Sequence, residues 1–168
     1  MKALSGALVV LVLDQITKAV VVHTMFRGQS IQVIGDFFRL TYIRNPGAAF
    51  GLNLGSPLVH TLVSLVALAA LGWLFWSTPS HQRSTRIALG LILGGAVGNI
   101  LDRVRYREVV DFLDFGLGSM RWPIFNVADM FVTLGVAYII LFYSRHDKSD
   151  RACATDSSQS SREPGAPH

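Results

Sequence analysis

Four long apolar segments separated by polar stretches dominate the hydrophobicity pattern of this chain. A helix rises 1.5 Å per residue, so about 20 apolar residues are needed to cross the roughly 30 Å hydrocarbon core of a bilayer. Each of the four segments has about this length, and we expect each to form a transmembrane helix. They are residues 3–22, 57–76, 87–104 and 124–143.

The segment between the first two apolar runs, residues 27–56, has a different pattern. Apolar and polar side chains mix on both sides of Gly35-Asp36. Short mixed runs around such a turn are typical of a β-hairpin. We therefore expect a small extracytoplasmic β-hairpin, a cradle lying on the membrane surface with Phe37, Phe38 and Tyr42 against lipid.

The remaining polar segments complete the predicted organisation. Residues 77–86 are too few to do more than join antiparallel neighbours, and residues 105–123 mix carboxylates, glycines and large apolar residues in a way that suits an interfacial segment. Residues 147–168 are rich in Ser, charge, Pro and Gly, which predicts a disordered cytoplasmic tail. The predicted fold class is membrane all-α with a small β element, in a single domain over residues 1–146.

Composition agrees with a membrane protein and excludes several other classes. The 168 residues are 51% hydrophobic, with a mean hydropathy of +0.41, which is high for a soluble domain. The net charge of +4 comes from dispersed basic residues, so we expect no nucleic-acid partner. The single cysteine, Cys153, lies in the polar tail and cannot build a disulfide framework or a thiolate metal site.

The chain ends and loops predict the orientation in the membrane. The first apolar run follows Lys2 like a secretory signal, but no small-x-small cleavage site follows it, so we expect an uncleaved span. Basic residues are nearly balanced between the two sides. They are denser in the short loop 77–86 and in the tail, which favours cytoplasmic termini.

Several polar residues fall within or at the ends of the predicted spans, where a charge costs about 2.5–3.5 kcal/mol at the helix centre. Asp14 and Lys18 are four positions apart on one helical face, which fits either a neutralised structural ion pair or a functional site. Arg103 could extend to the interface or pair with Asp102. The full set is Asp14, Lys18, Asn99, Asp102, Arg103, Asn126 and Asp129.

Asp129 is the strongest functional candidate among these residues. It has no cation within a helical turn along the sequence, and it shares a face with Asn126. An unpaired carboxylate inside a membrane is a functional candidate by default. Asp111 and Asp114 lie in the loop that leads toward Asp129, and by themselves both are interpreted as solvated loop carboxylates.

Glycines recur along the third predicted span at intervals of four, at Gly90, Gly94 and Gly98, with Gly95 beside them. Small residues at this spacing let two helices approach closely within a bilayer. The pattern predicts a tight helix-helix contact that holds the polar residues of neighbouring spans together.

Five short motifs, in this order and on this topology, resemble the lipoprotein signal peptidases, also called signal peptidase II. The resemblance extends from about residue 8 to residue 143. The motifs are LDQITK at 13–18, NPGAAFG at 45–51, GGAVGNILDR at 94–103, VVDF at 109–112 and FNVADM at 125–130.

The resemblance implies an aspartic endopeptidase of the bacterial cytoplasmic (inner) membrane, which cleaves a prolipoprotein before its diacylglyceryl-modified cysteine. It assigns Asp111 and Asp129 as the catalytic pair at the outer membrane-water boundary. It also implies no cofactor and no metal, membrane lipid as surroundings, a monomer, and inhibition by globomycin-type peptides. The supporting residues that it implies are Asp14, Lys18, Asn45, Asn99, Arg103 and Asn126.

Two other classes of function remain open from the residues alone. Intramembrane carboxylates also build proton relays, so a small proton-coupled transporter is the main alternative, and an assembly subunit is another. A serine or cysteine mechanism is not supported, because Cys153 lies in the tail and no histidine lies near a nucleophile motif. No group of residues has metal-ligand spacing.

Overall fold

The computed structural model describes residues 2–47 and 56–142. Residues 48–55 of the predicted cradle, which include part of the NPGAAFG motif, lie outside the described residues, as does the predicted tail 147–168.

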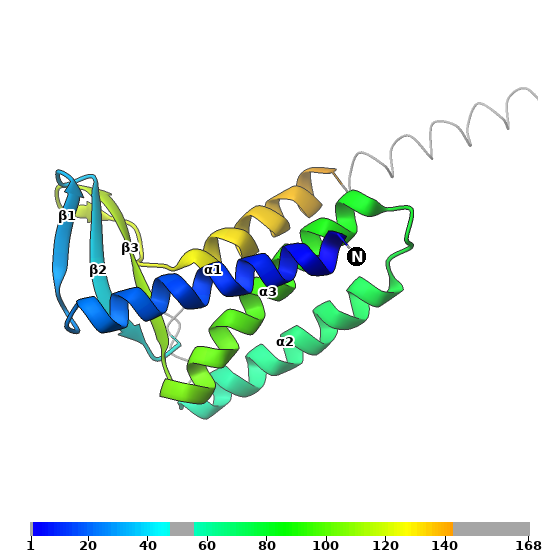
Figure 1. Ribbon diagram of the computed structural model, residues 1–168, viewed down its shortest axis with the longest axis horizontal. Helices are drawn as coiled ribbons and strands as arrows, with labels where there is room; N and C mark the ends of the chain where they lie inside the picture. Colours follow the sequence, from blue (N-terminus) through cyan, green and yellow to red (C-terminus); the bar gives the residue numbers. More distant parts are fainter. Residues whose placement is uncertain (1, 48–55, 143–168) are drawn as a thin grey trace, which may run out of the picture.

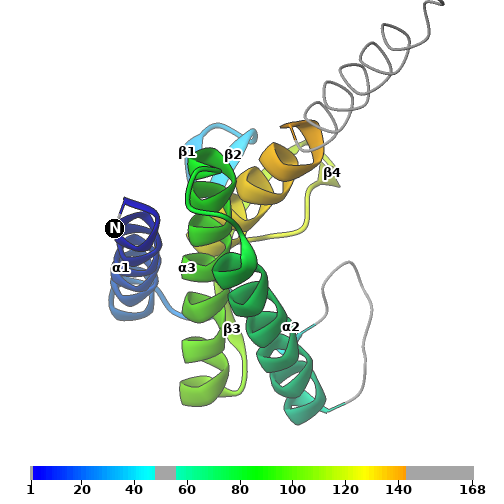
Figure 2. The same cartoon turned by 90° about the vertical axis from the view of Figure 1, so that its right-hand side faces the viewer.

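Helices that run along one long axis make up most of the molecule (Figure 1). They are α1 (Lys2–Thr24), α2 (Pro57–Ser77), α3 (Arg83–Tyr106) and an unlabelled helix, Val127–Phe142, coloured yellow to orange. α3 lies between α1 and α2 (Figure 2). By length and composition α1, α2 and α3 can cross a membrane, whereas Val127–Phe142 is apolar but shorter within the described residues.

The helix Val127–Phe142 begins three residues later than the predicted span. The helix begins later because Phe125 forms an isolated β-bridge with Leu113. The peptide N–H of Phe125 donates to the Leu113 carbonyl at 3.1 Å, and its own carbonyl accepts from Leu113 at 2.8 Å. These bonds keep the backbone extended up to Asn126.

The glycine pattern of α3 produces the predicted close helix contacts. A Cβ added at Gly90 would overlap the backbone carbonyl of Ala3, and one at Gly94 would overlap that of Ala7, so α1 lies directly on this face. A Cβ at Gly95 would lie 2.6 Å from the carbonyl oxygen of Ala128. α3 therefore packs closely against both of the helices that carry predicted site residues.

The outward faces of the helices remain apolar. On α1 the side chains of Leu8 and Ile16 are more than half exposed, and on α2 those of Val66 and Trp73 are about 70% exposed. Side chains of this kind are stable where hydrocarbon replaces water. The chain is a membrane protein.

A four-stranded antiparallel sheet lies at one end of the helices. Its strands, in spatial order, are β1 (Ser30–Ile34), β2 (Phe38–Asn45), β3 (Val109–Leu117) and β4 (Met120–Arg121). β1 and β2 form the predicted hairpin, and Gly35 adopts a positive φ of 48° in its turn. β3 and β4 were not predicted, because residues 105–123 were expected to form only an interfacial segment.

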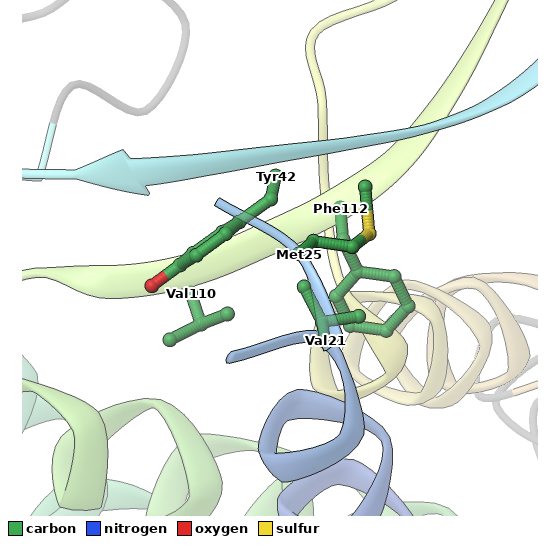
Figure 3. Packing of buried hydrophobic residues seen from close by; sticks show 5 residues of the cluster. All are labelled: Val21, Met25, Tyr42, Val110 and Phe112. Atoms are coloured by element: carbon green, nitrogen blue, oxygen red, sulfur yellow. The ribbon is translucent and has the colours of Figure 1, made fainter. Parts of the chain in front are cut away.

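An apolar cluster attaches the sheet to the end of α1 (Figure 3). Val21 of α1 and Met25, which directly follows this helix, pack against Tyr42 of β2 and against Val110 and Phe112 of β3. Tyr42 is only 5% exposed, so the prediction that it lies against lipid was wrong. Because Val110 and Phe112 point toward this cluster, the alternate residues of β3 point toward the other face of the sheet.

Asp114 holds the sheet together and is not the solvated loop residue that was predicted. It is 4% exposed, accepts a hydrogen bond from Arg121 Nε at 2.7 Å, and accepts another from Thr41 Oγ1 at 2.6 Å. Burial alone would raise the pKa of Asp114, but these hydrogen bonds outweigh it and lower the pKa. Arg121 also donates to the backbone carbonyl of Asp36 at 2.9 Å, which ties the hairpin to β3.

Candidate active site

Asp129 lies in the first turn of the helix Val127–Phe142, within a reciprocal cap. The Oδ1 atom of Asn126 accepts a hydrogen bond from the Asp129 peptide N–H at 3.0 Å. In return, Asp129 Oδ2 accepts from the Asn126 peptide N–H at 3.3 Å. This is a capping box in which Asn and Asp replace the usual Ser or Thr and Glu. The positive end of the helix dipole favours negative charge at this position.

Asp111 lies on β3, where it pairs in register with Ile43 of β2. Its side chain is 2% exposed, so it is a buried strand residue and not the loop residue that was predicted. Each of its oxygens accepts an amide hydrogen bond, Oδ2 from Asn45 Nδ2 at 2.9 Å and Oδ1 from Asn126 Nδ2 at 2.7 Å. Asn126 thus contacts both candidate carboxylates.

Asn99 of α3 extends the same hydrogen-bond network. Its Nδ2 donates to Asp129 Oδ1 at 2.8 Å. Its Oδ1 accepts from Asn126 Nδ2 at 3.1 Å and from Lys18 Nζ at 2.8 Å. Amide groups from α3, from β2 and from the residue before the last described helix therefore fix the orientation of both carboxylates.

The environment of Asp111 disfavours its charged form. Burial raises the pKa of Asp111 to about 7, and the charge of Asp129 acts in the same direction. The hydrogen bonds from Asn45 and Asn126 oppose this shift, as does the charge of Lys18. A carboxyl group with such a pKa exchanges its proton near neutral pH, as a general acid or base requires.

Arg103 of α3 places a positive charge beside the two carboxylates. Its guanidinium interacts electrostatically with Asp129 and Asp111. Nη1 donates to the Asn99 carbonyl at 3.3 Å, and among the described residues the buried Nε has no hydrogen-bond partner. Asp102, which the sequence suggested as a partner of Arg103, also interacts electrostatically with the guanidinium, but less than Asp129 and Asp111 do, and its carboxylate forms an ion pair with Lys18.

Lys18 lies in a buried ion cluster next to these residues. Its Nζ is 2.8 Å from Asp14 Oδ2, which establishes the predicted ion pair, and 2.9 Å from Asp102 Oδ2. The side-chain amide of Gln15 donates to Asp14 at 3.2 Å and to Asp102 at 3.3 Å. The structure thus brings all eight predicted site residues into one connected region.

Asp102 and Gln15 belong to this region but were not predicted as site residues. The sequence did contain a signal for Asp102, since it lies four positions after Gly98 and continues the glycine face of α3 toward α1. Gln15 lies within the LDQITK motif, but nothing in its spacing distinguishes it. Among the described residues, no three His, Cys, Asp or Glu side chains are arranged to hold a metal ion.

An apolar hollow of about 850 Å³ lies along β3 and β4 of the sheet. Phe115 and Leu117 of β3 line it, and they share a strand face with Asp111 because side chains alternate along a strand. Phe37, Met120 and Trp122 form other parts of the wall. Phe125 also lines the hollow and directly precedes Asn126, the residue that contacts both candidate carboxylates.

Comparisons with a family model and with known proteins agree with each other. Residues 6–145 match the family described as Signal peptidase (SPase) II. Two similar proteins are both named Lipoprotein signal peptidase. The one from Desulforapulum autotrophicum is 48% identical over 138 residues, which is 79% of this chain and 85% of that protein. The one from Syntrophus aciditrophicus is 42% identical over 137 residues, with the same coverage of 79% and 85%.

Two solved structures have the same fold. One, described as "Bacterial membrane enzyme structure by the in meso method at 1.9 A resolution", is 37% identical with a TM-score of 0.75 and covers 83% of this chain and 90% of its own. The other, described in the same words at 2.3 A, is 33% identical with a TM-score of 0.76 and covers 98% of this chain and 94% of its own.

Proposed function

The chain belongs to the signal peptidase II family, and from this we propose that it removes signal peptides from prolipoproteins by cleaving before the diacylglyceryl-modified cysteine. It is an aspartic-type peptidase. The family assignment argues against the two other functions considered from the sequence, a proton-coupled transporter and an assembly subunit. The observation that carries the proposed site is that Asn126 donates to Asp111 and forms the helix cap with Asp129, which brings the two carboxylates to one place.

Two carboxylates that share one proton can carry out amide hydrolysis. One accepts a proton from water, and the resulting hydroxide adds to the scissile carbonyl carbon. The other hydrogen-bonds the carbonyl oxygen, and its proton passes to the departing nitrogen as the C–N bond breaks. Nearby carboxylates titrate as a coupled pair because both cannot readily ionise at once.

The surroundings of the two aspartates support a division of roles. Asp111 holds the shared proton, because burial and the charge of Asp129 raise its pKa to about 7. Asp129 is the base, because the helix N-terminus and the amide of Asn99 both favour its ionised form. Arg103, whose Nε has no partner among the described residues, would donate to a substrate carbonyl.

The membrane arrangement follows from the positions of the site and the helices. We count Val127–Phe142 with α1, α2 and α3 as the fourth span, in the inner membrane of a bacterium, with both termini in the cytoplasm. The site at the sheet end then lies on the outer side, where acyl chains of the substrate stay in lipid while the scissile bond meets water. The same proposal includes a monomeric enzyme that globomycin-type peptides inhibit.

A cleavage assay tests the function directly. The purified chain in detergent is incubated with a diacylglyceryl-modified prolipoprotein, and signal-peptide release is followed by mass spectrometry. We expect a single cut before the modified cysteine, and much slower release from the same precursor without the lipid. Absence of any cut in the lipidated precursor by folded protein would refute the proposal.

The pH dependence of cleavage should respond to Asn45. The Asn45 amide stabilises ionised Asp111 and so lowers its pKa. Asn45→Ala removes this bond, so the pKa of Asp111 rises and the protonated form persists to higher pH. In the parent, kcat/KM should decline above about pH 7, because burial raises the pKa of Asp111 to about 7. In Asn45→Ala this alkaline limb should move to higher pH.

The matched control is Gln32→Ala, which removes an exposed amide that donates to Asp36 on the hairpin. The alkaline limb of this variant should coincide with that of the parent. An alkaline limb that stays in place or moves to lower pH in Asn45→Ala would show that Asp111 does not hold the titrating proton.

A further inference from the structure

Two buried carboxylates outside the proposed catalytic pair hold the backbone directly before each member of that pair. Oδ1 of Asp14 accepts a hydrogen bond from the peptide N–H of Ala128 at 2.9 Å, and Ala128 precedes one of the catalytic aspartates. Oδ2 of Asp102 accepts from the peptide N–H of Val110 at 3.1 Å, and Val110 precedes the other. The same contact therefore occurs on both segments that carry the pair.

A single ammonium group joins these two carboxylates. Lys18 Nζ lies 2.8 Å from Asp14 Oδ2 and 2.9 Å from Asp102 Oδ2. Asp14 is 0% exposed, Asp102 1% and Lys18 3%. Lys18 is the cation that compensates both buried carboxylates, and without it two negative charges would be left buried without a counter-charge, so the ammonium holds both carboxylates in place. Neither carboxylate can change position without affecting the other.

We propose that Asp14, Lys18 and Asp102 form a clamp that sets the relative position of Asp111 and Asp129. Each carboxylate fixes a peptide group next to a catalytic residue, and Lys18 fixes the two carboxylates relative to each other. The clamp residues are positioning residues, since their hydrogen bonds and ion pairs go to the backbone, to each other, to Gln15 and to Asn99, and not to Asp111 or Asp129 themselves. This inference rests on the proposed function of the two aspartates.

The clamp depends on the absence of a side chain at Gly98. A Cβ there would lie 2.5 Å from Asp14 Oδ2 and 3.2 Å from its carboxyl carbon. The atoms it would meet are the end of the Asp14 side chain, so Gly98→Ala displaces this carboxylate and leaves every charge in place. The variant thus separates the geometry of the clamp from its charge.

A double-mutant cycle of Asp14→Asn and Asp102→Asn tests the clamp. Each single variant should lose about 100-fold in kcat with KM unchanged, because a shift of about 1 Å between catalytic groups has this effect. Groups that act as a unit are not additive, so the double variant should lose little more than the worse single variant. The clamp would be overturned if the losses of the two single variants multiply in the double variant. It would also be overturned if the single variants keep the kcat of the parent or change only KM.

Thermal unfolding in detergent shows whether the Asn variants fold. If they do not, Gly98→Ala tests the clamp in their place. We expect it to lose kcat and keep KM. The matched control is Gly6→Ala, whose added Cβ would meet, within the part of the chain that the structure describes, only Leu91 Cδ2 at an ordinary 3.7 Å. This variant should retain both kcat and KM. Gly98→Ala with the parent's kcat would refute the clamp.

Asp111→Asn and Asp129→Asn in the same assay separate this inference from the proposed function. If either folded variant still cleaves at the parent's rate, the proposed catalytic pair itself is wrong. If both are inactive while the clamp variants retain kcat, the pair stands and only the clamp is wrong.

Discussion

Signal-peptide release is expected to fall at least about 10³-fold in both Asp111→Asn and Asp129→Asn, because each removes a proton-transfer group from the reaction. Asn at position 129 can still accept the hydrogen bond from the Asn126 peptide N–H, so the helix cap should survive. Asn at position 111 would turn its NH₂ group toward the amide donor of Asn45 or of Asn126. We therefore expect Asp111→Asn to be somewhat less stable than Asp129→Asn, and both to be inactive.

Asp114→Asn is the matched control for these two variants. Asp114 lies three residues after Asp111 on β3 and is also buried, but its partners are Arg121 and Thr41. Its replacement should lower the unfolding temperature and leave most of the cleavage activity. Equal losses of activity in all three variants would point to general damage of β3 and against a catalytic pair.

Gly94→Val is expected to lower the free energy of unfolding by about 3 kcal/mol, which is at the upper end of the usual cost of overpacking. A Cβ at Gly94 would overlap the Ala7 carbonyl, which is backbone and cannot rotate away. α1 must therefore move away from α3, and Asp14 and Lys18 move with it. Unfolding in detergent, followed by circular dichroism, measures this loss.

Gly72→Ala provides the opposite result on a comparable helix. No atom of the described residues 2–47 and 56–142 lies within 4 Å of a Cβ at Gly72 in α2. Alanine there should raise the free energy of unfolding by roughly 0.5–1 kcal/mol, because it reduces the backbone entropy of the unfolded chain. Similar stability in Gly94→Val and Gly72→Ala would contradict the close packing of α1 on α3.

The helical part of the fold could be predicted because its signals are local. Length and apolarity identify α1, α2 and α3 as candidate spans, and the interval of four between Gly90, Gly94 and Gly98 indicates the face on which a neighbour lies close. The turn at Gly35-Asp36 identified the β1-β2 hairpin in the same way. In each case residues a few positions apart carry the information.

β3 could not be predicted because its pattern is not alternating. Val109, Val110, Asp111 and Phe112 are all buried, since one face of the strand packs on the apolar cluster and the other faces the site. A strand covered on both faces has no exposed row of polar residues to reveal the period of two. For this reason Asp111 and Asp114 were interpreted as solvated loop residues.

Residue type and position along the chain were enough to identify which polar residues lie in or beside the membrane and, through five ordered motifs, the family of the chain. How those residues pair became apparent from the folded chain. Asp14 binds the peptide N–H of Ala128, 114 positions away, and Asn45 binds Asp111, 66 positions away. Helical periodicity relates only residues within about a turn of each other. Contacts at such separations depend on where whole helices and strands pack, and that packing places Asp102 beside Lys18.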